Sequence, residues 1–288
     1  MSDAGGTNRY PRGMRFDLIV VVIALSIGCG ESSQVSPTVD AASSVDPIRP
    51  SGYIDGACVG QPTGARVLVY TRENQYRHYS NLDARIALFG MCETRGFNVS
   101  STNDQLTINA RQLASFDVVV FAVTSGNGGI DNQGRADFEA WATAGGGIVG
   151  LHSASSTESD WPFYVDRIGA VFAHHENGLP TATVNVAATP HPITAGITSF
   201  QHDDEWYLFQ TRPEDKPGTQ VLLSLDEATL PSDYPAESKI GFHAIGWARE
   251  NAGSRTFYTA LGHTRSTFVD AAPLTLIGNA IEWAAHKR

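Results

Sequence analysis

From Ala65 onward the chain alternates strand-like runs with segments of helical periodicity. The strand-like runs lie at 66–70, 97–100, 117–123 and 148–151. Between the first two, apolar side chains recur at helical spacing from Leu82 to Cys92, and Ser80 with Asp83 resembles a capping box at the start of this helix. This order predicts an α/β fold, a flavodoxin-like three-layer sandwich with a mainly parallel central sheet.

The second half of the chain is less regular. Further strand-like segments lie at 181–186, 219–225, 239–245 and 255–259, and the segment 274–285 has the pattern of a terminal helix. Long polar loops separate these segments, but neither an internal repeat nor a sharp change of composition divides them. One elaborated domain over 65–288 therefore fits the pattern better than two domains.

Polar residues gather where the apolar runs end. The clearest case is a glycine cluster at 145–147 that leads into a short apolar run and ends at His152 and Ser153. In open α/β sheets, ligands bind beside the carboxyl ends of the strands, so this position predicts a site. The alternative is a glycine-rich turn before a core strand, with His152 only capping a helix.

The first part of the chain has the pattern of an export signal. Three arginines precede an apolar run at 18–27 that is too short to span a bilayer, and Gly28 and Cys29 follow it. We expect a signal peptide over 1–29, lipidation at Cys29 in the manner of bacterial lipoproteins, and a flexible tether over 30–64. Simple secretion is the alternative, because Ser26 and Asp17 depart from the lipoprotein pattern.

The composition limits the classes of partner that the protein is expected to bind. The formal net charge is −10, which argues against nucleic acid and leaves a lipid at Cys29 as the expected membrane contact. The chain carries no signal for its oligomeric state. Of the other cysteines, Cys92 lies on an apolar helical face, so a buried thiol is favoured over a bridge to Cys58. The segment 71–74 after the first strand lacks the glycines of a dinucleotide site, which argues against nicotinamide and flavin dinucleotides.

Six motifs together resemble the ThuA-like (trehalose utilisation) family over 66–286. They are GGIVGLHS at 146–153, WPFY at 161–164, GAVFAHH at 169–175, HPIT at 191–194, DEWY at 204–207 and FYTALGH at 257–263. The resemblance implies a class I glutamine amidotransferase-like fold and a role in carbohydrate metabolism, with oxidised (keto-)disaccharides or glycosides as ligands. The amidotransferase nucleophile, a cysteine, is missing at 150–154, so glutamine hydrolysis is not expected. The family's usual proline after His243 is absent as well.

The polar residues suit acid–base chemistry on a keto sugar, which needs a base, an acid and an electrophile near the carbonyl oxygen. Candidate catalytic residues are His152, His174, Glu205 and His263, and candidate substrate-binding residues are His78, Ser153, Trp161, Asp204, Trp206 and Tyr207. A divalent metal is an open alternative, and its ligands would be His78, His152, His174 and His263.

A Ser-His-acid triad through Ser153 is disfavoured, because its surroundings do not match the Gly-x-Ser-x-Gly motif. The competing function is a surface-tethered carbohydrate-binding protein without catalysis. Acid–base catalysis requires the candidate side chains to converge within hydrogen-bond reach, whereas a scatter beyond about 10 Å would exclude it.

Overall fold

A ten-stranded sheet runs through the centre of the molecule in the computed structural model, which describes residues 52–251 and 253–286. The strand order is β1-β3-β2-β4-β5-β12-β11-β10-β7-β8. The five strands from β3 to β12 are parallel to one another, and the flanking strands are antiparallel. A separate two-stranded sheet pairs β6 with β9. The predicted α/β sandwich with a parallel central sheet is confirmed.

The bounds of the elements are as follows. The strands are β1 Gly56–Cys58, β2 Arg66–Tyr70, β3 Asn98–Thr102, β4 Val118–Ala122, β5 Gly147–Leu151, β6 Phe172–His174, β7 Thr181–Val186, β8 Phe200–Asp203, β9 Leu208–Phe209, β10 Thr219–Asp226, β11 His243–Asn251 and β12 Ser254–Thr259. The α-helices are α1 Ser80–Arg95, α2 Ala110–Leu113, α3 Asn132–Thr143, α4 Pro162–Ile168 and α5 Ala271–Ala284. Short 3-10 helices lie at Gln105–Thr107, His152–Ser156, Pro192–Thr194, Pro213–Asp215, Glu227–Thr229, Ala236–Ser238 and Arg265–Phe268.

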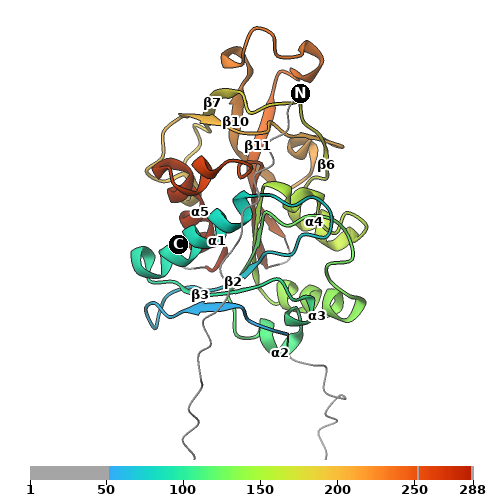
Figure 1. Ribbon diagram of the computed structural model, residues 1–288, viewed down its shortest axis with the longest axis vertical. Coiled ribbons are helices and arrows are strands. Elements are labelled where there is room, and N and C mark those ends of the chain that lie inside the picture. Colours follow the sequence, from blue (N-terminus) through green and yellow to red (C-terminus); the bar gives the residue numbers. More distant parts are fainter. Residues whose placement is uncertain (1–51, 252, 287–288) are drawn as a thin grey trace, which may run out of the picture. The chain divides into compact units, whose positions relative to one another are not determined.

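Helices cover both faces of the parallel strands. Figure 1 shows α1 and α5 together on one face, and α3 and α4 on the other. Every residue of β4 and β5 is buried, as expected for parallel strands with both faces covered. Asp131 begins α3 by accepting the Gly134 N–H at 2.8 Å, and Gly96 ends α1 with a φ of 73°. The parallel core therefore has its accessible positions at the strand ends.

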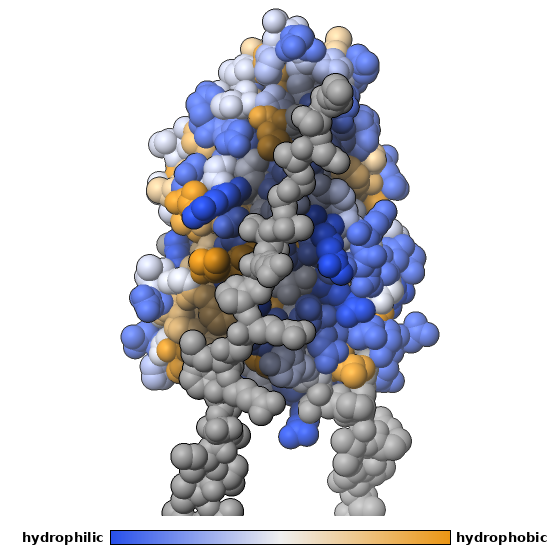
Figure 2. All heavy atoms as spheres, viewed as in Figure 1, coloured by the Kyte–Doolittle hydropathy of each residue, from blue (hydrophilic) through white to orange (hydrophobic). Residues whose placement is uncertain are grey.

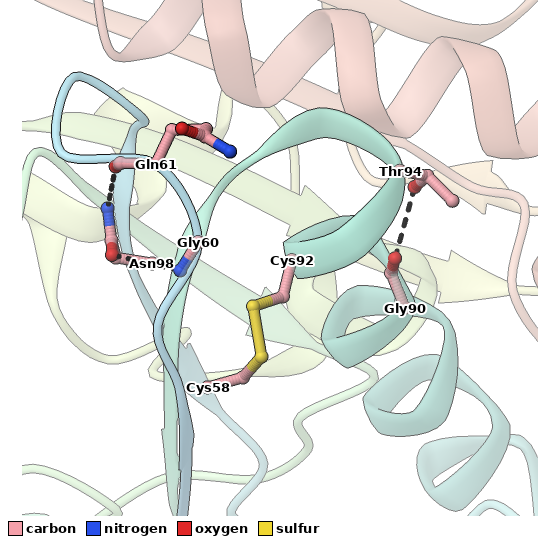
Figure 3. The surroundings of a disulfide bond; sticks show 7 residues. All are labelled: Cys58, Gly60, Gln61, Gly90, Cys92, Thr94 and Asn98. Carbon is pink, nitrogen blue, oxygen red and sulfur yellow. Dashed lines mark hydrogen bonds between the residues drawn. A yellow bond between two sulfur atoms is a disulfide. The ribbon is translucent and has the colours of Figure 1, made fainter.

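The edge of the sheet begins earlier in the chain than expected. Residues 52–64, assigned to the tether, include β1, which pairs with β3. Cys58 of β1 forms a disulfide with Cys92 of α1, so the preference for a free buried thiol was wrong (Figure 3). The Asn98 side chain donates to the Gln61 carbonyl and accepts the Gly60 N–H in the same region. The prediction that Cys92 lies on a helical face was correct, but the sequence could not show that an edge strand would lie against that face.

One strand of the second half is displaced from its expected place. The segment 239–245 was expected as a strand, whereas β11 begins at His243. The Glu227 carboxylate accepts the N–H groups of Ile240 and Gly241 at 2.7 and 2.9 Å. These backbone groups therefore bind a side chain instead of a neighbouring strand. The segments 181–186, 219–225 and 255–259 lie in strands, and α5 contains most of the expected terminal helix.

The part of the face that is visible in Figure 2 is mainly hydrophilic, with apolar residues in separate groups. Among the described residues, the structure has no helix with the length and apolar character needed to span a bilayer. The expected signal peptide and Cys29 lie outside the described residues.

Candidate functional site

His152 occupies a sharp turn at the carboxyl end of β5. Its φ is 53°, a left-handed conformation that is rare for residues other than glycine, and its side chain is fully buried. A Cβ on Gly262 would lie only 2.7 Å from the His152 Cβ, so the turn needs a glycine opposite it. His152 thus lies directly after the end of β5, where the sequence predicted a site, and its backbone conformation is strained.

The hydrogen bonds of His152 define its tautomer when the ring is neutral. Nδ1 lies 2.7 Å from the Ala260 carbonyl oxygen, which can only accept, so Nδ1 carries a proton. Nε2 then accepts from the Tyr207 hydroxyl at 2.8 Å. The same Nε2 lies 3.4 Å from Glu205 Oε2.

Glu205 lies at the centre of the histidines. Its Oε1 is 3.0 Å from His263 Nδ1 and 3.3 Å from His175 Nε2. Burial opposes ionisation of this carboxyl, but His152 and His263 outweigh burial and lower the pKa of Glu205 well below its usual range. Glu205 is therefore an anion surrounded by imidazoles at every pH at which the protein is expected to work.

Two histidines beside Glu205 have opposite pKa shifts. The Glu205 carboxylate raises the pKa of His263, against the opposing effect of burial. Burial lowers the pKa of His78, which lies beside Glu73 and edge-on to the rings of His152 and His263. A pair of groups with opposed shifts is the arrangement used when one group donates a proton and the other accepts one.

Asp204 holds the two loops that supply these residues. It is fully buried and accepts the backbone N–H groups of Glu205, Gly262 and His263 at 2.8, 2.8 and 3.0 Å. These bonds connect the loop after β8 to the loop after β12. Asp204 was expected to bind substrate, but its oxygens are used by the backbone. It is a positioning residue instead.

A cavity of about 300 Å³ lies beside this cluster. His78, Ser153, Glu205 and Tyr207 line it, as the sequence predicted for residues that contact a ligand. The sequence did not single out Tyr76, Ser125, Ser156, Phe172 and His175, which line it as well. Tyr76 and Ser125 follow β2 and β4, so position after a strand was a signal that could have found them.

His174 is the predicted catalytic residue that the structure places elsewhere. Its side chain is 59% exposed and lies 4.0 Å from Glu176, whereas the next residue, His175, contacts Glu205. Successive side chains of an extended segment point to opposite sides, so only one of the two can face the cavity. The correction moves the role from His174 to His175, a choice that the sequence motif leaves open.

Two predicted substrate-binding tryptophans also lie outside the cavity lining. The Trp161 indole donates to Glu139 at 2.7 Å and packs on Phe138. The Trp206 indole donates to the Pro180 carbonyl at 2.9 Å and is buried. Both are core aromatics with satisfied N–H groups, which corrects the prediction.

Four side chains of the cluster could hold a metal ion. His78, His152, Glu205 and His263 each offer one ligand atom, and these atoms lie within 4.8 Å of one another. His263 Nδ1 is buried without a well-aligned hydrogen bond, although Glu205 is only 3.0 Å away. Three imidazoles and one carboxylate are a donor set that zinc, iron and manganese accept. Glu205 replaces His174 in the ligand set expected from the sequence.

Comparisons with known proteins identify the family of this chain. A family model described as ThuA, trehalose utilisation, matches residues 66–284. A ThuA-like protein of solved structure from Bacteroides uniformis shares 24% identity and a TM-score of 0.65, over 80% of this chain and 95% of that chain. A ThuA-like protein from Parabacteroides merdae shares 18% identity and a TM-score of 0.61, over 78% of this chain and 91% of that chain.

A cytoplasmic protein from Salmonella typhimurium has the same fold at 10% identity, with a TM-score of 0.54 over 76% of this chain and 99% of that chain. No curated protein matches the chain. The structural likenesses show the fold, and the family model covers the sheet, the loops at its strand ends and the histidine cluster. The chain belongs to the ThuA (trehalose utilisation) family.

Proposed function

We propose that this protein is an enzyme that acts on a keto-disaccharide or keto-glycoside by acid–base chemistry. The observation that carries the proposal is the contact of one carboxylate, Glu205, with His152, His175 and His263 beside an open cavity. Ionisable groups within hydrogen-bond reach of each other are what proton transfer requires. The description of the family as trehalose utilisation supports a carbohydrate as the substrate.

Each group has a role that follows from its environment. His78, kept neutral by burial, takes the proton from the carbon next to the sugar's carbonyl group. The electron pair of that C–H bond moves onto the carbonyl oxygen, and the positive charge of protonated His263 stabilises the resulting oxyanion. The carbonyl then re-forms, a double bond forms between the deprotonated carbon and the glycosidic carbon, and the bond to the glycosidic oxygen breaks. The leaving oxygen takes a proton from His263.

The cavity has the size and lining for a sugar ring. Its volume of about 300 Å³ falls at the lower end of the range for small-molecule sites. Tyr76 is 59% exposed and its ring lies 4.6 Å from that of His78, so it offers a flat apolar face beside the proton acceptor. Ser125 and Ser153 add hydroxyl groups that can bind those of a sugar.

Turnover of paired substrates tests the proposal. Purified protein is incubated with 3-keto-glycosides and with their parent glycosides, and products are measured by NMR and mass spectrometry. We expect conversion of the keto sugars only, and a fall in kcat of at least about 100-fold in Glu205→Gln, because His263 loses the carboxylate that raises its pKa and keeps it protonated as the acid. Glu93→Gln, an exposed change on α1, is the matched control and should behave as wild type.

Binding without turnover would contradict this proposal and support the competing function, a carbohydrate-binding protein without catalysis. Equal activity of Glu205→Gln and Glu93→Gln would also contradict it. The aromatic wall at Tyr76 fits both functions, whereas the converging histidines support the enzyme.

A second candidate is a divalent cation held by the same cluster, favoured by the four ligand atoms of His78, His152, Glu205 and His263, which lie within 4.8 Å of one another. A cation there would polarise the carbonyl oxygen of the sugar. Metal analysis of the purified protein and thermal shifts with Zn²⁺ or Mn²⁺ test it. Bound metal that is lost in Glu205→Gln supports the cation, whereas turnover unaffected by a chelator in metal-free protein contradicts it.

We further propose that the protein is exported and anchored by a lipid on Cys29. The Cys58–Cys92 disulfide supports export, because disulfides persist in oxidising compartments. Fractionation of bacterial cells that express the full chain, with labelled palmitate, tests the anchor. Label and membrane location should both disappear in Cys29→Ala, and a cytoplasmic wild-type protein would contradict export.

A further inference from the structure

A second cavity lies on the other side of the loop that carries His78. Its volume is about 460 Å³, and it lies at the carboxyl ends of β2 and β3, between their loops and the start of α1. Three arginines line it: Arg72, Arg77 and Arg85. Glu73 also lines it and lies 3.6 Å from His78 in the first cavity, so one short loop forms a wall of both cavities.

Two of these arginines have no carboxylate partner among the described residues. Arg85 lies 3.4 Å from Asp55, whereas Arg77 has no ion pair there and Arg72 uses only its Nη1, on the Asn103 carbonyl at 3.2 Å. The Arg72 Nε is buried and has no hydrogen-bond partner in that part of the chain. The chain has 30 acidic and 20 basic residues, so carboxylates are in excess. Two guanidinium groups that lie beside a cavity and have no carboxylate partner among the described residues point to a ligand.

Each carboxylate of the cavity uses one oxygen in contacts within the protein. Asp55 contacts Arg85 and accepts from the Ser101 hydroxyl. Glu73 accepts the His78 backbone N–H at 2.6 Å. The first turn of α1, with Asn81 in the lining, adds the partial positive charge of a helix N-terminus. The lining of the cavity therefore carries more positive than negative charge, with three guanidinium groups against two carboxylates.

We propose that this second cavity binds the anionic group of a small ligand, a phosphate or a carboxylate, between Arg72 and Arg77. Guanidinium groups match these oxyanions in shape and charge, and two donors in a fork can hold one anion. The site is separate from the histidine cluster, so its occupancy does not depend on the chemistry proposed there. An anionic ligand bound here would lie against the loop that positions His78, and would link the two cavities.

Calorimetric titration of the full chain with inorganic phosphate, at pH 7.5 and low ionic strength, tests the proposal. We expect saturable binding of one phosphate in this cavity, weakened about tenfold or more in Arg77→Gln and in Arg72→Gln. Arg77 is exposed, so its replacement should leave the fold intact. Arg111→Gln removes the same charge from exposed α2 and should bind as wild type.

Two further experiments show which cavity binds phosphate and which anionic group the ligand carries. His263→Asn alters the first cavity only and should keep phosphate binding. Competition by glucose 6-phosphate identifies a phosphate ligand and competition by glucuronate a carboxylate ligand, while glucose should not compete. The proposal is overturned if phosphate does not bind saturably, if Arg72→Gln and Arg77→Gln bind as wild type, or if glucose competes as well as the anions.

Discussion

At the scale of single residues, position after a strand predicted which residues lie at the site, whereas the direction of each side chain could not be predicted. His78, His152, Glu205 and His263 converge as the sequence predicted, because the loops that carry them meet at one end of the sheet. The choice of His175 over His174 depends on which side of the extended chain faces the cavity, and no sequence pattern states this.

Gly262 is a residue on which the site geometry depends. Its φ is 147°, and an added Cβ would lie 2.7 Å from the His152 Cβ. Gly262→Ala should lower the free energy of unfolding by about 1–3 kcal/mol, as overpacking does, and should reduce turnover by displacing His152. Chemical denaturation and kinetics of the keto-sugar reaction measure the two effects.

Gly241→Ala separates the cost of a positive φ in alanine from the cost of the close contact with His152. Gly241 also has a positive φ, 84°, but an added Cβ would meet nothing within 4 Å. In this variant, the free energy of unfolding should fall only by the cost of the positive φ, and the activity should be unchanged. If both variants lose the same stability and neither loses activity, the close contact with His152 has no role.

At the scale of elements, the strands of the core followed from their apolar runs, while the ends of elements depended on partners distant in sequence. Ser80 begins α1 but does not cap it, because its hydroxyl donates to the Gly262 carbonyl at 2.6 Å. The capping-box prediction was therefore wrong. The disulfide was missed for the same reason, since it depends on β1 lying beside α1.

The disulfide should contribute measurable stability. It joins residues separated by 34 positions, and closing a loop of that length in the unfolded chain stabilises the fold by about 3–4 kcal/mol. Cys58→Ala/Cys92→Ala and reduced wild-type protein should both unfold at a lower denaturant concentration, and by the same amount. An unchanged midpoint in both would show that the bridge does not stabilise this fold.

The 3-10 helix Pro192–Thr194 should make stability depend on pH. His191 Nδ1 accepts the Ile193 N–H at 3.2 Å, which requires an unprotonated nitrogen, and burial lowers the pKa of His191. Below the unfolded pKa of about 6.5 the unfolded chain binds a proton that the folded chain does not, so this contribution to stability is present above 6.5 and is lost as the pH falls.

His191→Asn provides the comparison, because an asparagine oxygen caps the N–H at any pH. Between pH 7.5 and 5.5, the urea midpoint should fall further in wild type than in this variant. Parallel pH curves for the two proteins would show that His191 does not act as a pH-dependent cap.

At the scale of the whole molecule, the parallel half of the sheet was predictable and the antiparallel half was less so. Strands β2, β4 and β5 are buried runs separated by helices, which predict their pairing. The strands from β11 to β8 pair antiparallel through loops of varied length, and their order is set by contacts that no local pattern encodes. The histidine cluster lies where loops from both halves meet.

Release of deuterium from a labelled substrate tests the central claim, proton removal next to the carbonyl group, most directly. Wild-type protein and Glu205→Gln are incubated in H₂O with a 3-keto-glycoside deuterated at the carbon between the carbonyl and the glycosidic carbon, and loss of that deuterium is followed by NMR. The account predicts loss well above the buffer rate in wild type and at least about 100-fold slower in Glu205→Gln. Loss at the buffer rate with the wild-type protein would contradict it.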